Sequence, residues 1–165
     1  EDEDDDDEAS EQEMINYDIE VGLTGFINTD TDFMNEISDK IHPKLTELMQ
    51  RYITKWVTFD NVLTLQTEQV MFMLHEGHKW DLHCEQQSMR SPLQYASLRK
   101  LCMMIIIPGQ KLRGGSINFP YQDITIEPDK IGSNMCIMFP ACAFHAFSIQ
   151  EITHDQMTIL ISYMC

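Results

Sequence analysis

The spacing of hydrophobic and polar positions changes once along the chain. Between Asp32 and Tyr52 the apolar residues recur at intervals of three and four, the period of one helical face. They are Phe33, Ile37, Ile41, Leu45, Leu48, Met49 and Tyr52. Thr31 or Asp32 can cap the start of this helical segment, and Pro43 suits the first turn of a helix. The sequence therefore predicts two consecutive helices, divided at Pro43, whose apolar face packs on a sheet.

From Trp56 onward the pattern becomes one of short segments rich in β-branched and aromatic residues, separated by Gly, Pro, Asn and Asp. The predicted strands are Trp56–Leu65, Glu68–Leu74, Lys79–Cys84, Arg99–Ile107, Ser116–Phe119, Ile124–Glu127, Met135–Phe139, Phe144–Ile152 and Met157–Met164. No helical pattern lies between them. We therefore expect a mainly β fold, a barrel or sandwich covered on one side by N-terminal helices.

Acidic residues are concentrated at the start of the sequence. The 165 residues carry a net charge of −16, and ten of the first 13 are Asp or Glu. Without these ten, 17 acidic residues face 11 basic ones, a net charge of −6. We expect residues 1–15 to form a disordered acidic tail, either solvated or bound to a basic partner, and residues 16–165 to form one domain. This balance argues against binding of a nucleic-acid backbone.

Cysteine usage and hydropathy bear on the cellular location. The five cysteines are odd in number, form no CxxC motif, and lie mostly in apolar, strand-like segments. This is typical of buried thiols in a reducing compartment. The longest apolar stretch, Leu101–Pro108, has the length of a buried strand and not of a membrane span. We expect a cytoplasmic or otherwise intracellular protein that is not inserted in a membrane.

Histidine and glutamate supply the candidate chemistry. His83 and Glu85 are two positions apart, so on a strand their side chains point to the same side. Two imidazoles and one carboxylate can hold Fe(II) on one face and leave three coordination positions open. His145, in a late apolar segment, is the candidate third ligand. A half-buried structural role for the histidines is the alternative.

The surrounding residues resemble the prolyl 4-hydroxylase-like branch of the iron(II)/2-oxoglutarate dioxygenases. That family has a Gly and an aromatic residue before a His-x-Asp pair, then a basic residue, an apolar strand, a Gly-Gly pair, an aromatic-Pro pair, and a distal His. The matching residues here, in order and over roughly Glu68 to Cys165, are Gly77, Trp80, His83, Glu85, Arg99 and Lys100, LCMMIII, Gly114, Gly115 and Ser116, Phe119 and Pro120, Pro128, Gly132, MCIMFPA and His145.

The resemblance implies a fold, a cofactor and a reaction. The fold is a double-stranded β-helix of the jelly-roll or cupin-like type. Fe(II) would be held by His83, Glu85 and His145, with 2-oxoglutarate and O2 as cosubstrates. 2-Oxoglutarate would be oxidatively decarboxylated to succinate while a substrate C–H bond is hydroxylated. By analogy with the branch, the substrate would be a protein or peptide, with a prolyl side chain as the target.

Two residues depart from the family pattern. The family's Asp is Glu85 here, which is longer by one methylene group. The family also has a basic residue on the last strand, which pairs with the distal carboxylate of 2-oxoglutarate, and Gln156 stands in that place. Lys100 and Arg113 are the other candidates for binding this carboxylate, because a buried carboxylate needs a cation.

Two alternatives follow from these departures. The domain could be catalytically impaired and act as an interaction or assembly module, which fits the missing cation, the Glu85 replacement and the acidic tail. His75, His78 and Cys84 could together bind zinc or nickel, whose preferences these donors match. On a strand, however, His78 faces away from the side of His83.

We predict that deleting residues 1–13 leaves the melting temperature nearly unchanged. Binding of Mn(II), used as a surrogate for Fe(II), should also be nearly unchanged. Ten like charges without apolar partners add little to a core, and their mutual repulsion disfavours compaction. The truncated and full chains are compared by thermal unfolding and metal titration. A melting temperature lowered by more than a few degrees would show that this segment docks on the domain.

Overall fold

The structure is a computed structural model that describes six stretches of the chain. They are residues 15–16, 26–27, 31–55, 68–86, 99–131 and 135–164. Residues 1–14 of the expected acidic tail lie outside the described residues, as do the expected strand at Trp56–Leu65 and Gly132. The last residue of the expected tail, Ile15, lies in a short strand, Ile15–Asn16. No described helix combines the length and the apolar character needed to cross a bilayer.

One long helix covers the sheets. Helix α1 spans Thr31–Lys55 without interruption and contains Pro43. The prediction that Pro43 separates two helices is therefore wrong. A proline inside a helix removes one backbone hydrogen bond. Here the apolar face continues past it, and Leu45 and Met49 are buried on the sheet below, so tertiary packing outweighs the local cost.

The strands form one large antiparallel sheet. Its order is β1-β2-β3-β12-β5-β9. The bounds are β1 Ile15–Asn16, β2 Phe26–Ile27, β3 Glu68–His75, β12 Gln156–Met164, β5 Leu101–Pro108 and β9 Met135–Pro140. The last strand, β12, lies in the middle, with Tyr163 opposite Glu68 on one side and opposite Cys102 on the other. Segments far apart in the sequence are thus brought side by side.

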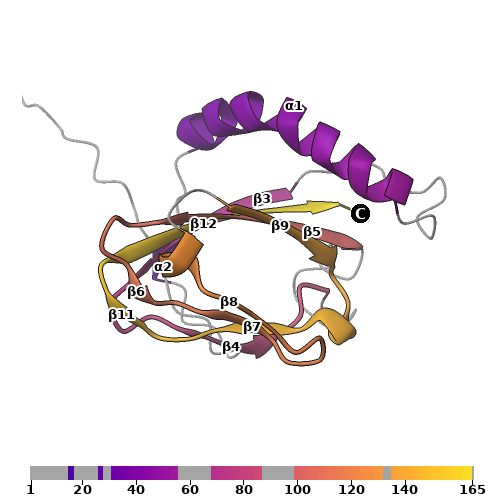
Figure 1. Cartoon of the computed structure of the whole chain (residues 1–165). Coiled ribbons are helices and arrows are strands. Elements are labelled where there is room, and N and C mark those ends of the chain that lie inside the picture. The colour runs from indigo at the N-terminus through magenta and orange to yellow at the C-terminus, as the bar shows by residue number, and fades with distance from the viewer. Residues whose placement is uncertain are drawn as a thin grey trace, which may run out of the picture.

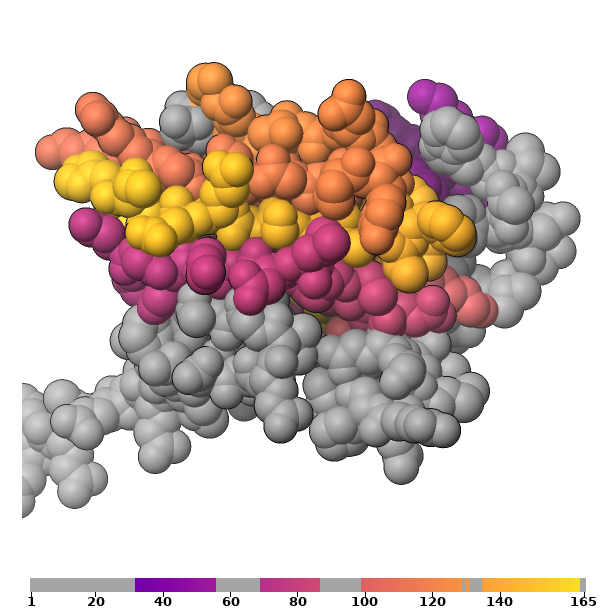
Figure 2. Space-filling view, turned by 90° about the horizontal axis from the view of Figure 1, so that it is seen from below, coloured from indigo at the N-terminus to yellow at the C-terminus, as the bar shows by residue number. Residues whose placement is uncertain are grey.

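A smaller sheet lies opposite the large one (Figure 1). Its order is β4-β10-β7-β8, and a separate pair consists of β11 and β6. The bounds are β4 Trp80–His83, β10 Phe147–Ile149, β7 Ile117–Phe119, β8 Ile124–Ile126, β11 Ile152–His154 and β6 Arg113–Gly114. Figure 2 shows the outer side of this sheet as successive bands, with β4 in magenta, the β10 region in yellow and β7 and β8 in orange. A short helix, α2, spans Pro128–Ile131.

The main core fills the space between the two sheets, and a second core lies under α1. Strand β5 contributes to both, because alternate side chains of a strand point to opposite faces. Cys102, Met104 and Ile106 belong to the core between the sheets, whereas Leu101 and Met103 pack against α1. Burial on both faces explains why this strand is a continuous apolar run.

The described elements confirm the expected mainly β class and most of the expected strands. The exception is the predicted strand Phe144–Ile152. It is divided into a short 3-10 helix, η3 (Ala143–His145), strand β10, and the start of β11. A run of apolar residues cannot by itself show where a chain turns from one sheet into the next. His145 consequently lies on a turn, and Phe147 begins the strand.

Two glycines with positive φ allow a matched test of backbone strain. Gly114 has φ +78°, and a Cβ there would lie 2.2 Å from the carbonyl oxygen of Glu151. Gly77 has φ +86°, but a Cβ there would meet nothing within 4 Å. We predict that Gly77→Ala lowers the free energy of unfolding by roughly 1–2 kcal/mol, the cost of a left-handed residue. Gly114→Ala should cost about 1–3 kcal/mol more, because the chain must also shift.

Chemical denaturation of both variants measures the difference. Equal destabilisation by the two substitutions would contradict the close approach of Gly114 to the carbonyl oxygen of Glu151, the residue just before β11.

Candidate functional site

His83 and Glu85 converge at the end of β4. His83 is the last residue of the strand, and Glu85 follows it after one residue. His83 Nε2 lies 3.5 Å from Glu85 Oε1, and the two side chains are only 8% and 6% exposed. The expected convergence of this pair is therefore present in the structure.

The ring of His83 is oriented by its second nitrogen. Nδ1 lies 2.8 Å from the carbonyl oxygen of Asp81. A carbonyl can only accept a hydrogen bond, so in the neutral ring the proton is on Nδ1 and the lone pair is on Nε2, toward Glu85. Metal-binding histidines commonly donate their other N–H to such a group.

Aromatic rings fix the position of His83 from two sides. The ring centroid of His83 lies 4.6 Å from that of Phe147 and 5.7 Å from that of Trp80. Phe147 of β10 is the residue paired with His83 across the small sheet. Because Trp80 and Phe147 are almost fully buried, they form an apolar wall on this side of the pair.

The carboxylate of Glu85 is held on its other side by Tyr163 and Arg99. The Tyr163 hydroxyl donates to Glu85 Oε2 at 2.6 Å. Arg99 Nη1 donates to the backbone carbonyl of Glu85 at 3.2 Å and lies 3.6 Å from Oε2. Arg99 Cζ lies 3.6 Å from the centroid of the Tyr163 ring. All three residues are buried, so a negative and a positive group compensate each other inside the protein.

Tyr163 remains a hydrogen-bond donor in this environment. Burial raises the pKa of its hydroxyl well above the usual range, and the negative charge of Glu85 raises it further. The pKa of the Cys102 thiol is also raised well above its usual value, first by burial and then by Glu85. Both groups therefore stay protonated at neutral pH, and Arg99 is the cation that faces the Glu85 carboxylate.

His145 lies apart from the His83–Glu85 pair. It ends η3, two residues before Phe147, and its Nδ1 lies 3.3 Å from Cys142 Sγ. Burial lowers the pKa of its ring, which favours the neutral form that can bind a metal. Among the described residues, no three His, Cys, Asp or Glu side chains gather closely enough to hold a metal ion. The structure thus brings together two of the three predicted ligands.

His83, Glu85 and His145 are residue types that bind Fe(II). His83 and Glu85 are also close enough together to share one ion, whereas His145 is not beside them. Two neutral imidazoles and a carboxylate are the ligands of a facial triad. Oε1 of Glu85 and Nε2 of His83 face each other, while Oε2 and Nδ1 are tied to other groups. The atoms that remain directed at one point are therefore those that a metal would bind.

The three residues predicted to bind the cosubstrate carboxylate are all exposed. Gln156 begins β12 opposite His75, Arg113 lies on β6, and Lys100 precedes β5. Arg99, which is buried beside Glu85, was not among these predictions. The available signal was a basic residue directly before the long apolar run of β5, most of which is buried. A buried charge next to an apolar strand needs a partner, but the sequence does not name it.

The alternative set of His75, His78 and Cys84 is not gathered either. The His75 backbone N–H donates to His78 Nδ1 at 3.0 Å, so that ring is engaged in a turn between β3 and β4. Cys84 Sγ lies at the other end of β4, 3.1 Å from the carbonyl oxygen of Gln86. These residues do not form a metal-binding cluster in the described part of the chain.

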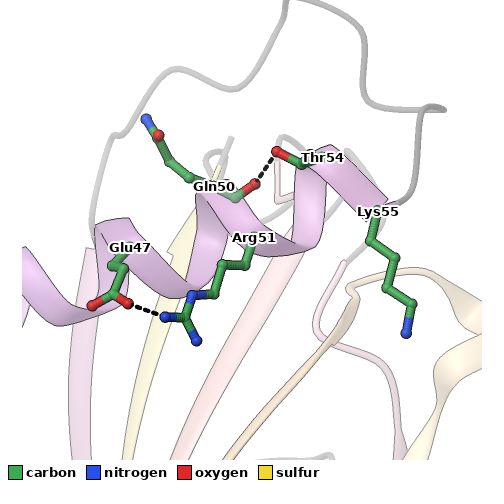
Figure 3. A pocket seen from close by; sticks show the side chains of 5 residues that line it. All are labelled: Glu47, Gln50, Arg51, Thr54 and Lys55. Atoms are coloured by element: carbon green, nitrogen blue, oxygen red, sulfur yellow. Dashed lines mark hydrogen bonds and ion pairs between the residues drawn. The ribbon is translucent and has the colours of Figure 1, made fainter.

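A pocket of about 470 Å³ lies on α1 (Figure 3). It is lined by Glu47, Gln50, Arg51, Thr54 and Lys55. Arg51 is paired with Glu47, and the Thr54 hydroxyl donates to the carbonyl of Gln50. None of the predicted site residues lines it, so we do not assign the chemistry of His83 and Glu85 to this pocket.

Comparison with known proteins supports the fold through structure alone. No family model and no curated protein matches the sequence. The viral collagen prolyl hydroxylase of Paramecium Bursaria Chlorella virus-1, solved as a 2OG complex, has a TM-score of 0.53 and 13% identity over 76% of this chain and 72% of its own. A Pseudomonas putida prolyl-4-hydroxylase has a TM-score of 0.62 and 10% identity, with 90% and 76% covered.

The fold is that of solved prolyl hydroxylases. A Burkholderia pseudomallei oxidoreductase of the 2OG-Fe(II) oxygenase family is also similar, with a TM-score of 0.53 and 11% identity over 92% of this chain and 63% of that one. These likenesses confirm the expected two-sheet β architecture. At such low identity they do not assign an activity or a substrate.

We predict that Tyr163→Phe lowers the free energy of unfolding by about 1.5–3 kcal/mol. The substitution keeps the ring beneath Arg99 but leaves the buried Oε2 of Glu85 without its donor, and hydrogen bonds to charged groups contribute this much. Tyr121→Phe is the matched control, because Tyr121 is 65% exposed. Urea unfolding of both variants measures the effect. Equal stability of the two would contradict the hydrogen bond to Glu85.

Proposed function

We propose that the chain is an Fe(II)- and 2-oxoglutarate-dependent oxygenase that hydroxylates a protein or peptide substrate, with a prolyl side chain as the target. The observation that carries the proposal is the His83–Glu85 pair, whose Nε2 and Oε1 atoms converge inside a fold shared with prolyl hydroxylases. In this proposal the two sheets form a double-stranded β-helix, and residues 16–165 form the catalytic domain behind an acidic tail.

His83, Glu85 and His145 would hold the iron. When bound, Fe(II) with 2-oxoglutarate and O2 supplies the oxidising chemistry. His145 would bind through Nε2, because its Nδ1 faces Cys142. The Asp81 carbonyl keeps His83 in the tautomer with its lone pair on Nε2, and Tyr163 restrains Oε2 so that Oε1 remains toward the histidine.

The apolar wall of Trp80 and Phe147 excludes water from one side of the pair. A drier site strengthens the interaction between the donors and a cation. It also protects a reactive centre from side reactions with solvent. This chain's own contribution to the reaction is thus to orient two ligands and shield them.

A second function is supported by one specific observation. Because His145 contacts Cys142 and not the His83–Glu85 pair, the domain could serve as an interaction or assembly module that does not turn over substrate. Glu85 would then be a structural partner of Arg99 and Tyr163. Iron-dependent binding of 2-oxoglutarate separates the two functions. Under anaerobic conditions it gives a visible charge-transfer band, which an assembly module would lack.

We predict that the purified chain binds one Mn(II), used as a surrogate for Fe(II), and that His83→Ala and His145→Ala each abolish this binding. A site with three protein ligands rarely survives the loss of one. His154→Ala is the control, because His154 is exposed on β11. Isothermal titration with Mn(II) provides the measurement. Unchanged affinity in both alanine variants would refute the ligand assignment.

A further inference from the structure

We propose that Gln122 is a positioning residue that sets where His145 lies relative to the His83–Glu85 pair. The inference rests on the proposed function and deepens it, because it names the contact on which the place of the third ligand depends. Gln122 belongs to the turn between β7 and β8, and its side chain contacts the backbone of η3.

The loop that carries His145 is anchored at both ends to the segment that carries the pair. At one end, the Gln86 N–H donates to the carbonyl of Ala141 at 2.6 Å. At the other end, Phe147 pairs with His83 across the small sheet. The residues between these anchors, which include His145, therefore begin and end beside the segment of the pair. What remains to be fixed is the middle of the loop.

Packing does not fix this middle part. No residue of η3 is buried, and the side chain of Phe144 is 77% exposed. The backbone bond from the His145 N–H to the carbonyl of Cys142, at 2.8 Å, closes the turn on itself and does not reach another element. The position of η3 against the sheets therefore depends on polar contacts with neighbouring elements.

Gln122 supplies such a contact. Its Nε2 donates to the carbonyl oxygen of Phe144 at 2.5 Å. Its own backbone N–H donates to the carbonyl of Phe119 at 3.1 Å and so closes the turn after β7. Phe119 is buried, its ring centroid lies 5.5 Å from that of Phe147, and the Phe147 ring lies 4.6 Å from that of His83. Gln122 thus connects η3 to the aromatic cluster that also fixes His83.

The other end atom of the Gln122 amide indicates that this side chain adds little net stability. Oε1 is buried and has no hydrogen-bond partner in the described part of the chain. A buried acceptor without a donor costs free energy, whereas the hydrogen bond from Nε2 contributes free energy. Because these effects oppose each other, an unbranched apolar side chain should serve the folded state about as well. The bond to Phe144 therefore matters more for the place of η3 than for folding.

Gln122→Met tests this role, because it keeps an unbranched side chain of similar length but removes both the donor and the unpartnered acceptor. Isothermal titration of the full chain with Mn(II) should show an affinity lowered roughly tenfold, as is typical when a group that orients a ligand is removed. The melting temperature should remain nearly unchanged. Thr125→Val is the matched control, because it removes the 2.9 Å bond from Thr125 Oγ1 to Asn118 Oδ1 in the same hairpin. Its Mn(II) affinity should equal that of the wild type.

Gln122→Glu decides the question if Gln122→Met does not fold. An ionised glutamate has nearly the same shape but cannot donate to the Phe144 carbonyl. Its negative charge by itself would attract a cation, so a lowered Mn(II) affinity in this variant can only come from the lost donor.

Three results would overturn the role of Gln122. They are unchanged Mn(II) affinity in Gln122→Met (or in Gln122→Glu where the first variant does not fold), an equal loss of affinity in Thr125→Val, and a loss of affinity that is matched by a large fall in melting temperature. The last result would show that the side chain serves only folding.

The same titrations distinguish this inference from the proposed function. If the wild type binds no Mn(II), the proposed function fails and the inference fails with it. If the wild type binds Mn(II) and His145→Ala abolishes this binding, but Gln122→Met does not weaken it, the ligand assignment stands and the inference alone fails.

Discussion

The described structure depends on how it compensates one buried carboxylate. Glu85 is 6% exposed, and leaving such a charge without partners inside a protein would cost several kcal/mol. Its partners come from distant parts of the chain, with Arg99 before β5 and Tyr163 near the end of the central strand β12. The contacts of Glu85 with Arg99 and Tyr163 thus connect the segment after β4 to the segment that enters β5 and to β12 of the large sheet. This arrangement leaves one oxygen of Glu85 directed at His83.

In the proposed function, the same interaction both prepares Glu85 for a metal and opposes the charge of that metal. A carboxylate with one oxygen held by Tyr163 is restrained before any metal arrives, so less conformational freedom is lost on binding. The neighbouring guanidinium, in contrast, opposes a divalent cation unless an anion enters with it. Metal and acidic cosubstrate are therefore expected to bind with positive coupling, because each offsets the charge that the other adds. A protein that used Glu85 only for stability would show no such coupling.

Several features of the fold and site could be predicted from local patterns. The two-residue spacing predicts that His83 and Glu85 converge, and they do, although Glu85 lies just past the end of β4. The apolar run of Leu101–Pro108 predicts a buried strand, and most of β5 is buried. Other features depend on long-range pairing and could not. The register that sets Tyr163 opposite Cys102, and so beside Glu85, has no local signature. Helix α1 continues through Pro43 because its face is buried, and His145 lies on a turn because the chain changes direction before β10.

The most direct measurement is a crystal structure of the full chain grown with Mn(II), in which anomalous scattering locates the metal. We expect one peak within coordination distance of His83 Nε2 and Glu85 Oε1, with the Tyr163 hydroxyl still hydrogen-bonded to Oε2. His145 should bind the same ion through Nε2, with its Nδ1 still facing Cys142. A structure without a peak at this pair, in which Glu85 remains engaged only with Arg99 and Tyr163, would contradict the claim that this buried carboxylate serves a metal.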